Sequence, residues 1–225
     1  MRPLLVLRPE PGNAASVAAA RALGLRVLGA PLFAVEAVAW TAPDPHGCAG
    51  ILAGSANLFR LGGAGLAALT TLPVLAVGAE TARAARDAGF AVAAVGEGGL
   101  AEVARHLAPG RYLRLSGADP VPLAVPPGVL VETITVYAAR PLPLSAAAQA
   151  MLAQPCVVAL HSGEAARHFA TECDRLGLAR RQIALACLAP RIAAMAGRGW
   201  QAVEISAMRR DQPLLALAWQ MCQNL

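Results

Sequence analysis

Short apolar runs alternate along almost the whole chain with segments of helical periodicity. Continuous apolar runs such as Pro3–Leu7 and Val157–Leu160 are typical of strands that are buried on both faces of a parallel sheet. Gly24, Gly89 and Gly177 each follow a segment of helical pattern, and glycine ends a helix readily because it adopts the left-handed conformation without strain. This regular alternation predicts an α/β fold with parallel sheets.

The pattern also gives bounds for most of these elements. The expected strands are 3–7, 25–28 with an extension towards 38, 51–53, 75–77, 91–95, 111–115, 130–137, 157–160, 183–187 and 202–205. The expected helices are 13–23 with Asn13 as its cap, 55–69, 80–88, 100–107, 164–176, 190–196 and one that begins near Pro213. The stretch 117–128 holds four prolines, so its helix is expected to be shortened or missing.

Two stretches of the chain recur later in the sequence. ILAGSANLF (51–59) matches VALHSGEAARHF (158–169) at the serine that follows the strand. AVGAETARAARDAGF (76–90) matches ACLAPRIAAMAGRGW (186–200) in register. About ten expected strands and this recurrence predict two five-stranded domains rather than one sheet. A linear arrangement of the domains and an insertion of one into the other are both compatible with the pattern.

The composition sets limits on size, redox chemistry and location. With 225 residues, 56% of them hydrophobic, the chain can bury the core of one or two small domains. Its five cysteines are scattered without a CxxC pair, so we expect buried thiols rather than disulfides or a zinc site. No His/Cys/Asp cluster has metal-ligand spacing, and no metal is expected. Charged residues and prolines interrupt the apolar runs, which predicts a cytoplasmic protein without a membrane span.

All 19 basic residues are arginines, and the net charge is +5. The absence of lysine excludes Schiff-base chemistry and a Walker-type phosphate lysine. Arginine binds carboxylates and phosphates well, which makes an acidic partner plausible, although an arginine-rich composition inherited from a GC-rich genome is the favoured explanation for most positions. The arginines are dispersed and aromatic residues are few, so no nucleic-acid partner is expected.

Candidate binding residues stand where expected strands lead into helices. Ser55 and Ser162 occupy this position, and each can cap its helix or leave the free N–H groups as an anion site. In Gly78–Thr81 a glycine turn precedes an acidic and a hydroxyl residue, which suit a first helical turn. Tyr137 ends an alternating strand, where it can serve as an amphipathic interface residue or through its hydroxyl.

A glycine-rich stretch supports a different function. Gly96–Ala101 has the form G-x-G-x-x-A between an expected strand and an expected helix, with Asp119 downstream. This is a partial dinucleotide fingerprint, although it lies mid-chain and lacks a clear helix before the next strand. A nucleotide-dependent enzyme is therefore one alternative.

Several motifs together resemble the uroporphyrinogen-III synthase family along almost the whole chain. They are VLRPEP (6–11), GSAN (54–57), AVGAETARAARDAGF (76–90), ETITVYAARP (132–141) and LHSGE (160–164). The resemblance implies two flavodoxin-like parallel-sheet lobes, one inserted into the other, with the ligand in the cleft between them. The implied bounds are 1–36 and 142–225 for the first lobe, 41–136 for the inserted lobe, and 37–40 and 137–141 for two extended connectors.

The resemblance also implies an activity. The family consists of lyases of haem biosynthesis that cyclise hydroxymethylbilane, an acidic linear tetrapyrrole, to uroporphyrinogen III without a cofactor. Tyr137 matches the tyrosine usually proposed to assist the departure of hydroxide as water. The expected substrate-binding residues are Arg8, Ser55, Ala56, Asn57, Gly78, Ala79, Glu80, Thr81, Ser162, Gly163 and Arg191. A monomer that binds neither nucleic acid nor membranes is expected.

The chain departs from the family pattern at two turns. Leu188 and Arg191 stand where the family has Gly and Thr, and an arginine binds a carboxylate more strongly than a hydroxyl does. Leu115-Ser116-Gly117 replaces the RG-type turn often found after the 111–115 strand. A non-catalytic tetrapyrrole- or anion-binding paralogue on the same two-lobe scaffold is therefore the alternative to the cyclase.

Overall fold

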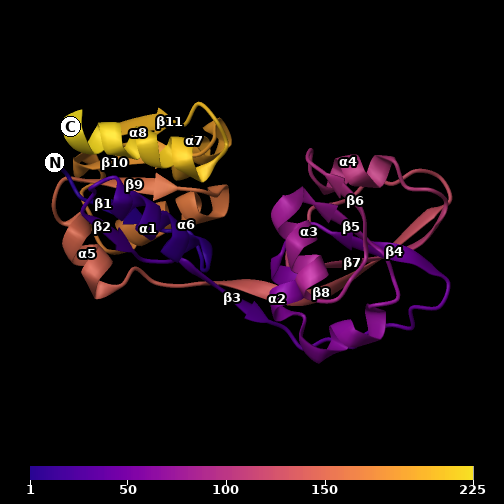
Figure 1. Cartoon of the computed structure of the whole chain (residues 1–225). Coiled ribbons are helices and arrows are strands. Elements are labelled where there is room, and N and C mark those ends of the chain that lie inside the picture. The colour runs from indigo at the N-terminus through magenta and orange to yellow at the C-terminus, as the bar shows by residue number, and fades with distance from the viewer. Residues whose placement is uncertain (225) are drawn as a thin grey trace. The chain divides into compact units, whose positions relative to one another are not determined.

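The computed structural model describes residues 1–224 and separates them into two compact units (Figure 1). The first lobe consists of residues 1–34 and the chain from Arg140 onward, and the second lobe consists of Val35–Ala139. The chain passes between the lobes twice, within strand β3 (Phe33–Ala37) and within strand β8 (Val129–Pro141). The second lobe is thus inserted into the first, and residues 137–141 are the last part of β8.

The first lobe is built on a five-stranded sheet in the order β11-β10-β9-β1-β2, with every neighbouring pair parallel. Its strands are β1 (Leu4–Val6), β2 (Val27–Gly29), β9 (Cys156–Leu160), β10 (Ile183–Cys187) and β11 (Ala202–Ile205). Its helices are α1 (Gly12–Ala22), α5 (Ala146–Leu152), α6 (Gly163–Arg175), the 3-10 helix η2 (Arg180–Gln182), α7 (Pro190–Ala196) and α8 (Asp211–Asn224). In chain order within the lobe the sheet is 2-1-3-4-5, the flavodoxin-like arrangement.

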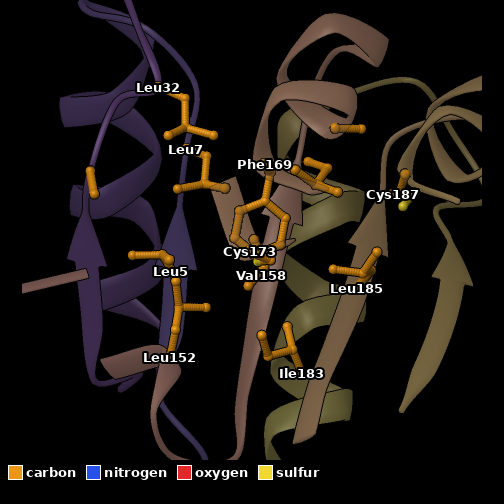
Figure 2. Packing of buried hydrophobic residues seen from close by; sticks show 14 of the residues in the cluster. Leu5, Leu7, Leu32, Leu152, Val158, Phe169, Cys173, Ile183, Leu185 and Cys187 are labelled. Atoms are coloured by element: carbon orange, nitrogen blue, oxygen red, sulfur yellow. The ribbon is translucent and has the colours of Figure 1, made fainter. Parts of the chain in front are cut away.

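Helices cover both faces of this sheet, because successive residues of a strand point to opposite sides. On one face Leu5, Val158 and Leu185 pack with Phe169 of α6 and with residues of α5 and α7 (Figure 2). On the other face, strand residues such as Val157 pack with α1 and α8. Every residue of β1, β9 and β10 is buried, which confirms that the continuous apolar runs form interior strands.

The second lobe contains a six-stranded sheet in the order β3-β8-β7-β4-β5-β6. Its other strands are β4 (Cys48–Ala53), β5 (Val74–Val77), β6 (Val92–Gly96) and β7 (Gly110–Gly117), and β4 to β8 pair in parallel. Its helices are α2 (Asn57–Leu61), the 3-10 helix η1 (Gly63–Leu69), α3 (Gly78–Asp87) and α4 (Leu100–Arg105).

The two faces of the second sheet are covered differently. Helices α2 and α3 with η1 pack on one face, around Ile51, Phe59 and Phe90. The other face is covered by α4 and by the segment 118–128, from which Leu123 packs against this smaller core. The segment contains no helix, as its prolines predict.

The two sheets share one spatial arrangement but differ in chain connection. Strands β4-β5-β6 of the second lobe correspond to β9-β10-β11 of the first, and β7-β8 correspond to β1-β2. Numbered in chain order from β4, the parallel part of the second sheet, β8-β7-β4-β5-β6, is 5-4-1-2-3. The recurrence of 51–59 in 158–169 and of 76–90 in 186–200 falls on corresponding strands and helices.

Three local expectations differ from the structure. The helix expected over 55–69 is divided into α2 and η1, with Gly63 in the left-handed region (φ +62°) where η1 begins. Asn13 does not cap α1, because it lies inside the first turn and its amide donates to two carbonyls near the end of β1, at 2.9 and 3.0 Å. Helix α5 was not expected, and Ser145 caps it by accepting a hydrogen bond from the N–H of Ala148.

Candidate active site

In the first lobe, the carboxyl ends of β1 and β9 lie side by side, with Leu5 paired to Val158. Arg8 follows β1, and Ser162 and Gly163 follow β9, so three of the expected binding residues stand at one edge of the sheet. The strand order of the sheet reverses between β1 and β9. In open α/β sheets such a reversal creates a crevice at the carboxyl ends of the strands, where ligands bind.

Asp211, the first residue of α8, connects the loops at this edge. Its Oδ1 accepts a hydrogen bond from Nε2 of His161 at 2.7 Å and lies 3.4 Å from Nη1 of Arg8. Its Oδ2 accepts a bond from Oγ of Ser16 at 2.8 Å, and Ser16 accepts one from Nη1 of Arg8 at 3.2 Å. One carboxylate therefore joins the loop after β1, helix α1, the loop after β9 and the start of α8.

Burial and hydrogen bonding act in opposite directions on Asp211. Partial burial by itself raises the pKa of its carboxyl, but hydrogen bonds from His161 and Ser16 and the charge of Arg8 bring the net pKa below the ordinary value. The carboxylate is therefore ionised at neutral pH. The His161 side chain is only 9% exposed, and its Nδ1 has no hydrogen-bond partner among residues 1–224.

Ser162 caps helix α6, since its Oγ accepts a hydrogen bond from the N–H of Ala165 at 3.2 Å. The prediction of a cap at this serine is confirmed. Gly163 begins the helix and is buried, and a Cβ there would lie 2.2 Å from Sδ of Met195. The other N–H groups of the first turn have no partner within the helix, and the positive end of its dipole lies beside them.

In the second lobe, Ser55, Ala56 and Asn57 connect β4 to α2. Oγ of Ser55 accepts a hydrogen bond from the N–H of Asn57 at 3.2 Å, while Ala56 occupies the N-cap position without a side-chain bond. The prediction of a cap at Ser55 is therefore wrong, and its hydroxyl instead closes the turn before the helix. Ala56 is buried, whereas Ser55 and Asn57 are half-buried.

The first turn of α3 contains the next four expected binding residues. Gly78 has a φ of +78°, which only glycine adopts without strain, and it turns the chain from β5 into the helix. Ala79 is exposed, whereas Thr81 is buried. The Glu80 carboxylate pairs with Arg60 of α2 at 2.7 Å, so its charge is offset by a neighbouring helix.

Tyr137 lies near the end of β8 and pairs with Gly117 of β7. A register shift between Ser116 and Gly117 brings these two residues opposite each other. A Cβ at Gly117 would lie 2.8 Å from Cε2 of the tyrosine, so the bare glycine makes room for the ring. The half-buried ring also packs against the larger core of the second lobe. The departure from the RG-type turn therefore leaves the glycine that this tyrosine requires.

Arg114 is a further candidate beside Tyr137. It is 9% exposed, its Nη1 donates to the carbonyl of Val121 at 2.8 Å, and its Nε has no partner among residues 1–224. Burial lowers the pKa of its guanidinium, and the nearby Tyr137 opposes this by favouring the charged form. A charged residue in the middle of an expected buried strand is the sequence signal for such a site.

The turn after β10 corresponds to the Gly78–Thr81 turn of the second lobe. Leu188, at the glycine position, packs against the cores on both faces of the first sheet. Arg191 is exposed in the first turn of the seven-residue helix α7 and has no ion-pair partner among the described residues. Its guanidinium is available to an anion.

The glycine-rich stretch 96–101 does not form an open phosphate loop. Helix α4 has only six residues and begins after Gly99, whose φ is +94°. A Cβ at Gly98 would collide with the Glu102 carboxylate, so an acidic side chain lies where a phosphate would approach. This geometry gives the nucleotide-dependent alternative no support.

The cysteines add no candidate reactive group to the site, and residues 1–224 offer neither a metal-binding cluster nor a membrane-spanning helix. Four free cysteines are buried, and burial raises the pKa to about 12 for Cys156, Cys173 and Cys187 and to about 11 for Cys222. Within residues 1–224, no group of three or more His, Cys, Asp or Glu could hold a metal ion. No helix in that range is long and apolar enough to cross a membrane.

Comparisons with known proteins bear on both fold and family. The family model described as uroporphyrinogen-III synthase HemD matches residues 14–216. A uroporphyrinogen-III synthetase structure from Helicobacter pylori is 16% identical, with a TM-score of 0.67, over 98% of this chain and 100% of that one. A mutant uroporphyrinogen III synthase from Thermus thermophilus is 20% identical, with a TM-score of 0.56, over 99% and 100%. No curated protein sequence matches the chain.

The two kinds of similarity have different weight. At 16% and 20% identity, the solved structures establish the α/β fold alone. The family match covers most of the chain and includes the strands and turns that carry most of the motifs noted from the sequence. The chain therefore belongs to the uroporphyrinogen-III synthase family and is an enzyme of tetrapyrrole synthesis, in the branch that leads to haem.

Proposed function

We propose that this chain is a lyase that dehydrates and cyclises hydroxymethylbilane to uroporphyrinogen III with inversion of ring D. The hydroxyl group on ring A takes up a proton and leaves as water, and the substituted α-carbon of ring D attacks the resulting methylene cation to give a spiro intermediate. The bond from that carbon to the methylene bridge of ring C then breaks, the bridge bonds to the free α-carbon of ring D, and loss of the proton from that carbon gives the inverted isomer. The observation that carries this proposal is the family match over residues 14–216, which spans most of both carboxyl-end edges described above.

The chemistry of the substrate explains why strong nucleophiles and a cofactor are not required. The cation that remains after loss of water is delocalised over a pyrrole ring, and the substrate also closes unaided to the uninverted isomer. The protein therefore has to hold both ends of the linear tetrapyrrole in the pose that forms the spiro intermediate. It also has to exclude direct closure, so its main task is to orient the substrate. We also propose that the enzyme acts as a cytoplasmic monomer, and light scattering would test its oligomeric state.

The eight carboxylates of hydroxymethylbilane give the protein its means of orientation. The first turns of α3, at Gly78–Thr81, and of α6, at Ser162–Gly163, offer backbone N–H groups beside the positive end of a helix dipole. Each such contact contributes roughly 0.3–1 kcal/mol. The loop Ser55–Asn57, Arg8 and the exposed Arg191 complete the proposed carboxylate-binding set.

Tyr137 is the proposed proton donor to the departing hydroxyl. Its ring is fixed against Gly117, and the buried guanidinium of Arg114 is close enough to interact electrostatically with its charged form. The phenolic O–H would donate its proton to the oxygen that departs as water. Gly117 and Arg114, three residues apart in β7, would both support the tyrosine.

The direct test of the activity is analysis of the product isomers. Purified protein receives hydroxymethylbilane generated in situ, and the oxidised porphyrins are separated by liquid chromatography. We expect isomer III in excess over a control without the protein. Isomer I alone, from protein shown by circular dichroism to be folded, would contradict the cyclase and favour a tetrapyrrole-binding protein.

The role of Tyr137 is tested by Tyr137→Phe, with Tyr112→Phe as the matched control. Tyr112 is the other tyrosine, and its hydroxyl donates to the carbonyl of Ala108 at 3.2 Å, away from the proposed site. We expect Tyr137→Phe to lower kcat by about a hundredfold, the usual scale of general acid catalysis. Equal rates for Tyr137→Phe and the wild type would remove the tyrosine from the mechanism.

A further inference from the structure

The guanidinium of Arg8 is held on two sides. Its Nη1 edge contacts Ser16 at 3.2 Å and Asp211 at 3.4 Å. The guanidinium also lies against Gly12 at the start of α1, where a Cβ would approach Nε to 2.5 Å and Nη2 to 2.6 Å. The side chain of Arg8 therefore has one preferred position, set by a carboxylate at one edge and by a bare glycine beside it.

The remaining edge of Arg8 is free. Its Nε and Nη2 make no hydrogen bond with any residue of the described chain, and the side chain is 31% exposed. Nε and Nη2 form the parallel fork of donors that binds both oxygens of a carboxylate. An arginine with one edge anchored and this fork open is arranged to receive an anion.

The N–H groups in the first turn of α6 form a second group of hydrogen-bond donors, and His161 connects them to the carboxylate of Asp211. His161 bonds to Asp211 through Nε2 at 2.7 Å and is followed directly by Ser162, the N-cap of α6. The strands that carry Arg8 and His161 are paired neighbours, so both loops emerge at the reversal point of the sheet. The carboxylate therefore connects the Arg8 fork with the positive end of α6.

We propose that Asp211 is a positioning residue that orients Arg8 and the His161–Ser162 turn as one subsite for a side-chain carboxylate of the substrate. The ligand carboxylate accepts two hydrogen bonds from the Arg8 fork and faces the first turn of α6. Asp211 itself does not touch the ligand, because both of its oxygens are used by Arg8, Ser16 and His161. This inference deepens the proposed function and rests on it for the identity of the substrate.

The first test is Asp211→Asn, which keeps the shape of the side chain and removes its charge. We expect KM for hydroxymethylbilane to rise about three- to tenfold while kcat stays within about twofold, because the Arg8 fork is no longer held in place. Asp174→Asn is the matched control: Asp174 is an exposed carboxylate of the same lobe that pairs with Arg180. It should leave both constants unchanged.

Two further variants separate positioning from a merely structural effect. Gly12→Ala leaves every charge in place but displaces the end of the Arg8 side chain, and it should raise KM as Asp211→Asn does. Arg8→Gln removes the fork and should raise KM about tenfold or more, the cost of losing charge-assisted hydrogen bonds. Adding Asp211→Asn to Arg8→Gln should then cause a smaller loss than Asp211→Asn causes in the wild type, because only the His161–Ser162 turn remains for Asp211 to orient. Additive losses would show that Asp211 acts independently of Arg8 and would overturn the proposal.

A binding measurement makes the inference independent of turnover. The octacarboxylic porphyrin uroporphyrin III is titrated into each variant, and its fluorescence reports Kd. If the wild type is active and Asp211→Asn has the same KM and Kd as the wild type, the subsite is overturned and the cyclase remains supported. An inactive wild type that binds the porphyrin less tightly after Asp211→Asn would overturn the proposed function and keep the subsite. Absence of binding by folded wild type would overturn the subsite.

Discussion

The β1–β2 connection of the first lobe and the β7–β8 connection of the second occupy corresponding places in two sheets of the same spatial order. The first connection contains helix α1, whereas the second contains the helix-free segment 118–128. Helix α1 supplies Gly12 and Ser16, which hold Arg8 in place. Without a helix, the second connection holds its arginine, Arg114, through a single backbone carbonyl of Val121.

This difference shows how one arrangement of strands gives two kinds of edge. At the first edge, side chains are fixed by other side chains, and Arg8 and Asp211 carry opposite charges in close contact. At the second edge, the proposed groups are a half-buried phenol and a buried guanidinium without a carboxylate partner in the described chain. The first edge is thus suited to binding an anion in a fixed pose, and the second to stabilising charge that develops during a reaction.

The largest expected effect is on the free energy of unfolding, when a phenylalanine is removed from the hydrophobic core of either lobe. Phe169 is fully buried and stacks on Trp200, so Phe169→Ala should lower the free energy of unfolding by about 3–5 kcal/mol. Phe90 begins the segment that leads into the outermost strand β6 and is slightly exposed, and Phe90→Ala should cost less. Urea unfolding followed by circular dichroism measures both. A larger loss for Phe90→Ala would show that the second lobe depends more strongly on its core.

A smaller effect is expected at Glu172, the buried carboxylate of the first lobe. Arg175 donates to both of its oxygens at 2.6 and 2.8 Å, and the N–H of Leu144 donates at 2.9 Å. The hydrogen bonds from Arg175, together with the one from Leu144, outweigh burial and lower the pKa of Glu172 from 4.5 to about 2. Glu172→Gln should cost about 1–3 kcal/mol at neutral pH, because charged hydrogen bonds are lost.

The sign of the pH dependence follows from the lowered pKa. The ionised form of Glu172 is favoured in the folded state, so its contribution is complete above pH 4.5 and is lost as the pH falls towards 2. The stabilities of the wild type and Glu172→Gln should therefore converge over this interval in denaturant titrations at stepped pH. The exposed Glu164 of the same helix provides the control Glu164→Gln, whose difference from the wild type should stay small throughout. A constant gap for Glu172→Gln would contradict the assignment.

The smallest effect on stability is expected for Arg114→Met. Arg114 is a buried charged residue of the second lobe, as Glu172 is of the first. Burying the guanidinium without a counter-charge is costly, and methionine keeps much of the length of the side chain while removing that cost. The loss of the bond to Val121 and the relief of desolvation should nearly cancel, leaving a change of less than about 1 kcal/mol. Urea unfolding measures it, and a loss as large as that of Glu172→Gln would show that Arg114 is primarily structural.

Local sequence pattern predicts the α/β fold well because buried strands and glycine helix stops are encoded by neighbouring residues. The bounds Ile183–Cys187, Pro190–Ala196 and Ala202–Ile205 agree with the structure for this reason. Pattern fails where long-range contacts decide. The amide of Asn13 bonds to the end of β1 instead of capping its helix, and Ser55 closes a turn.

The polar contacts of the candidate site are the least predictable part. Asp211 and Ser16 are 195 residues apart in sequence, so no local spacing predicts that they meet. Arg8, Tyr137 and the strand-to-helix turns emerge from motif resemblance, but the groups that hold Arg8 and Tyr137 depend on strand order and on register shifts. The sequence therefore predicts where ligand-binding edges occur, and the fold determines which side chains hold them.

The backbone N–H of Arg2 donates to the carbonyl of Cys222 at 2.9 Å, so the two segments of the first lobe meet beside its sheet. A flexible link between these positions would close a short loop, which costs little conformational entropy. A rearranged gene could then encode residues 140 to 222 followed by 2 to 34, which retains all five strands of the first sheet in one continuous polypeptide. Such a polypeptide would allow the carboxylate chemistry of Arg8 and Asp211 to be studied apart from that of Tyr137.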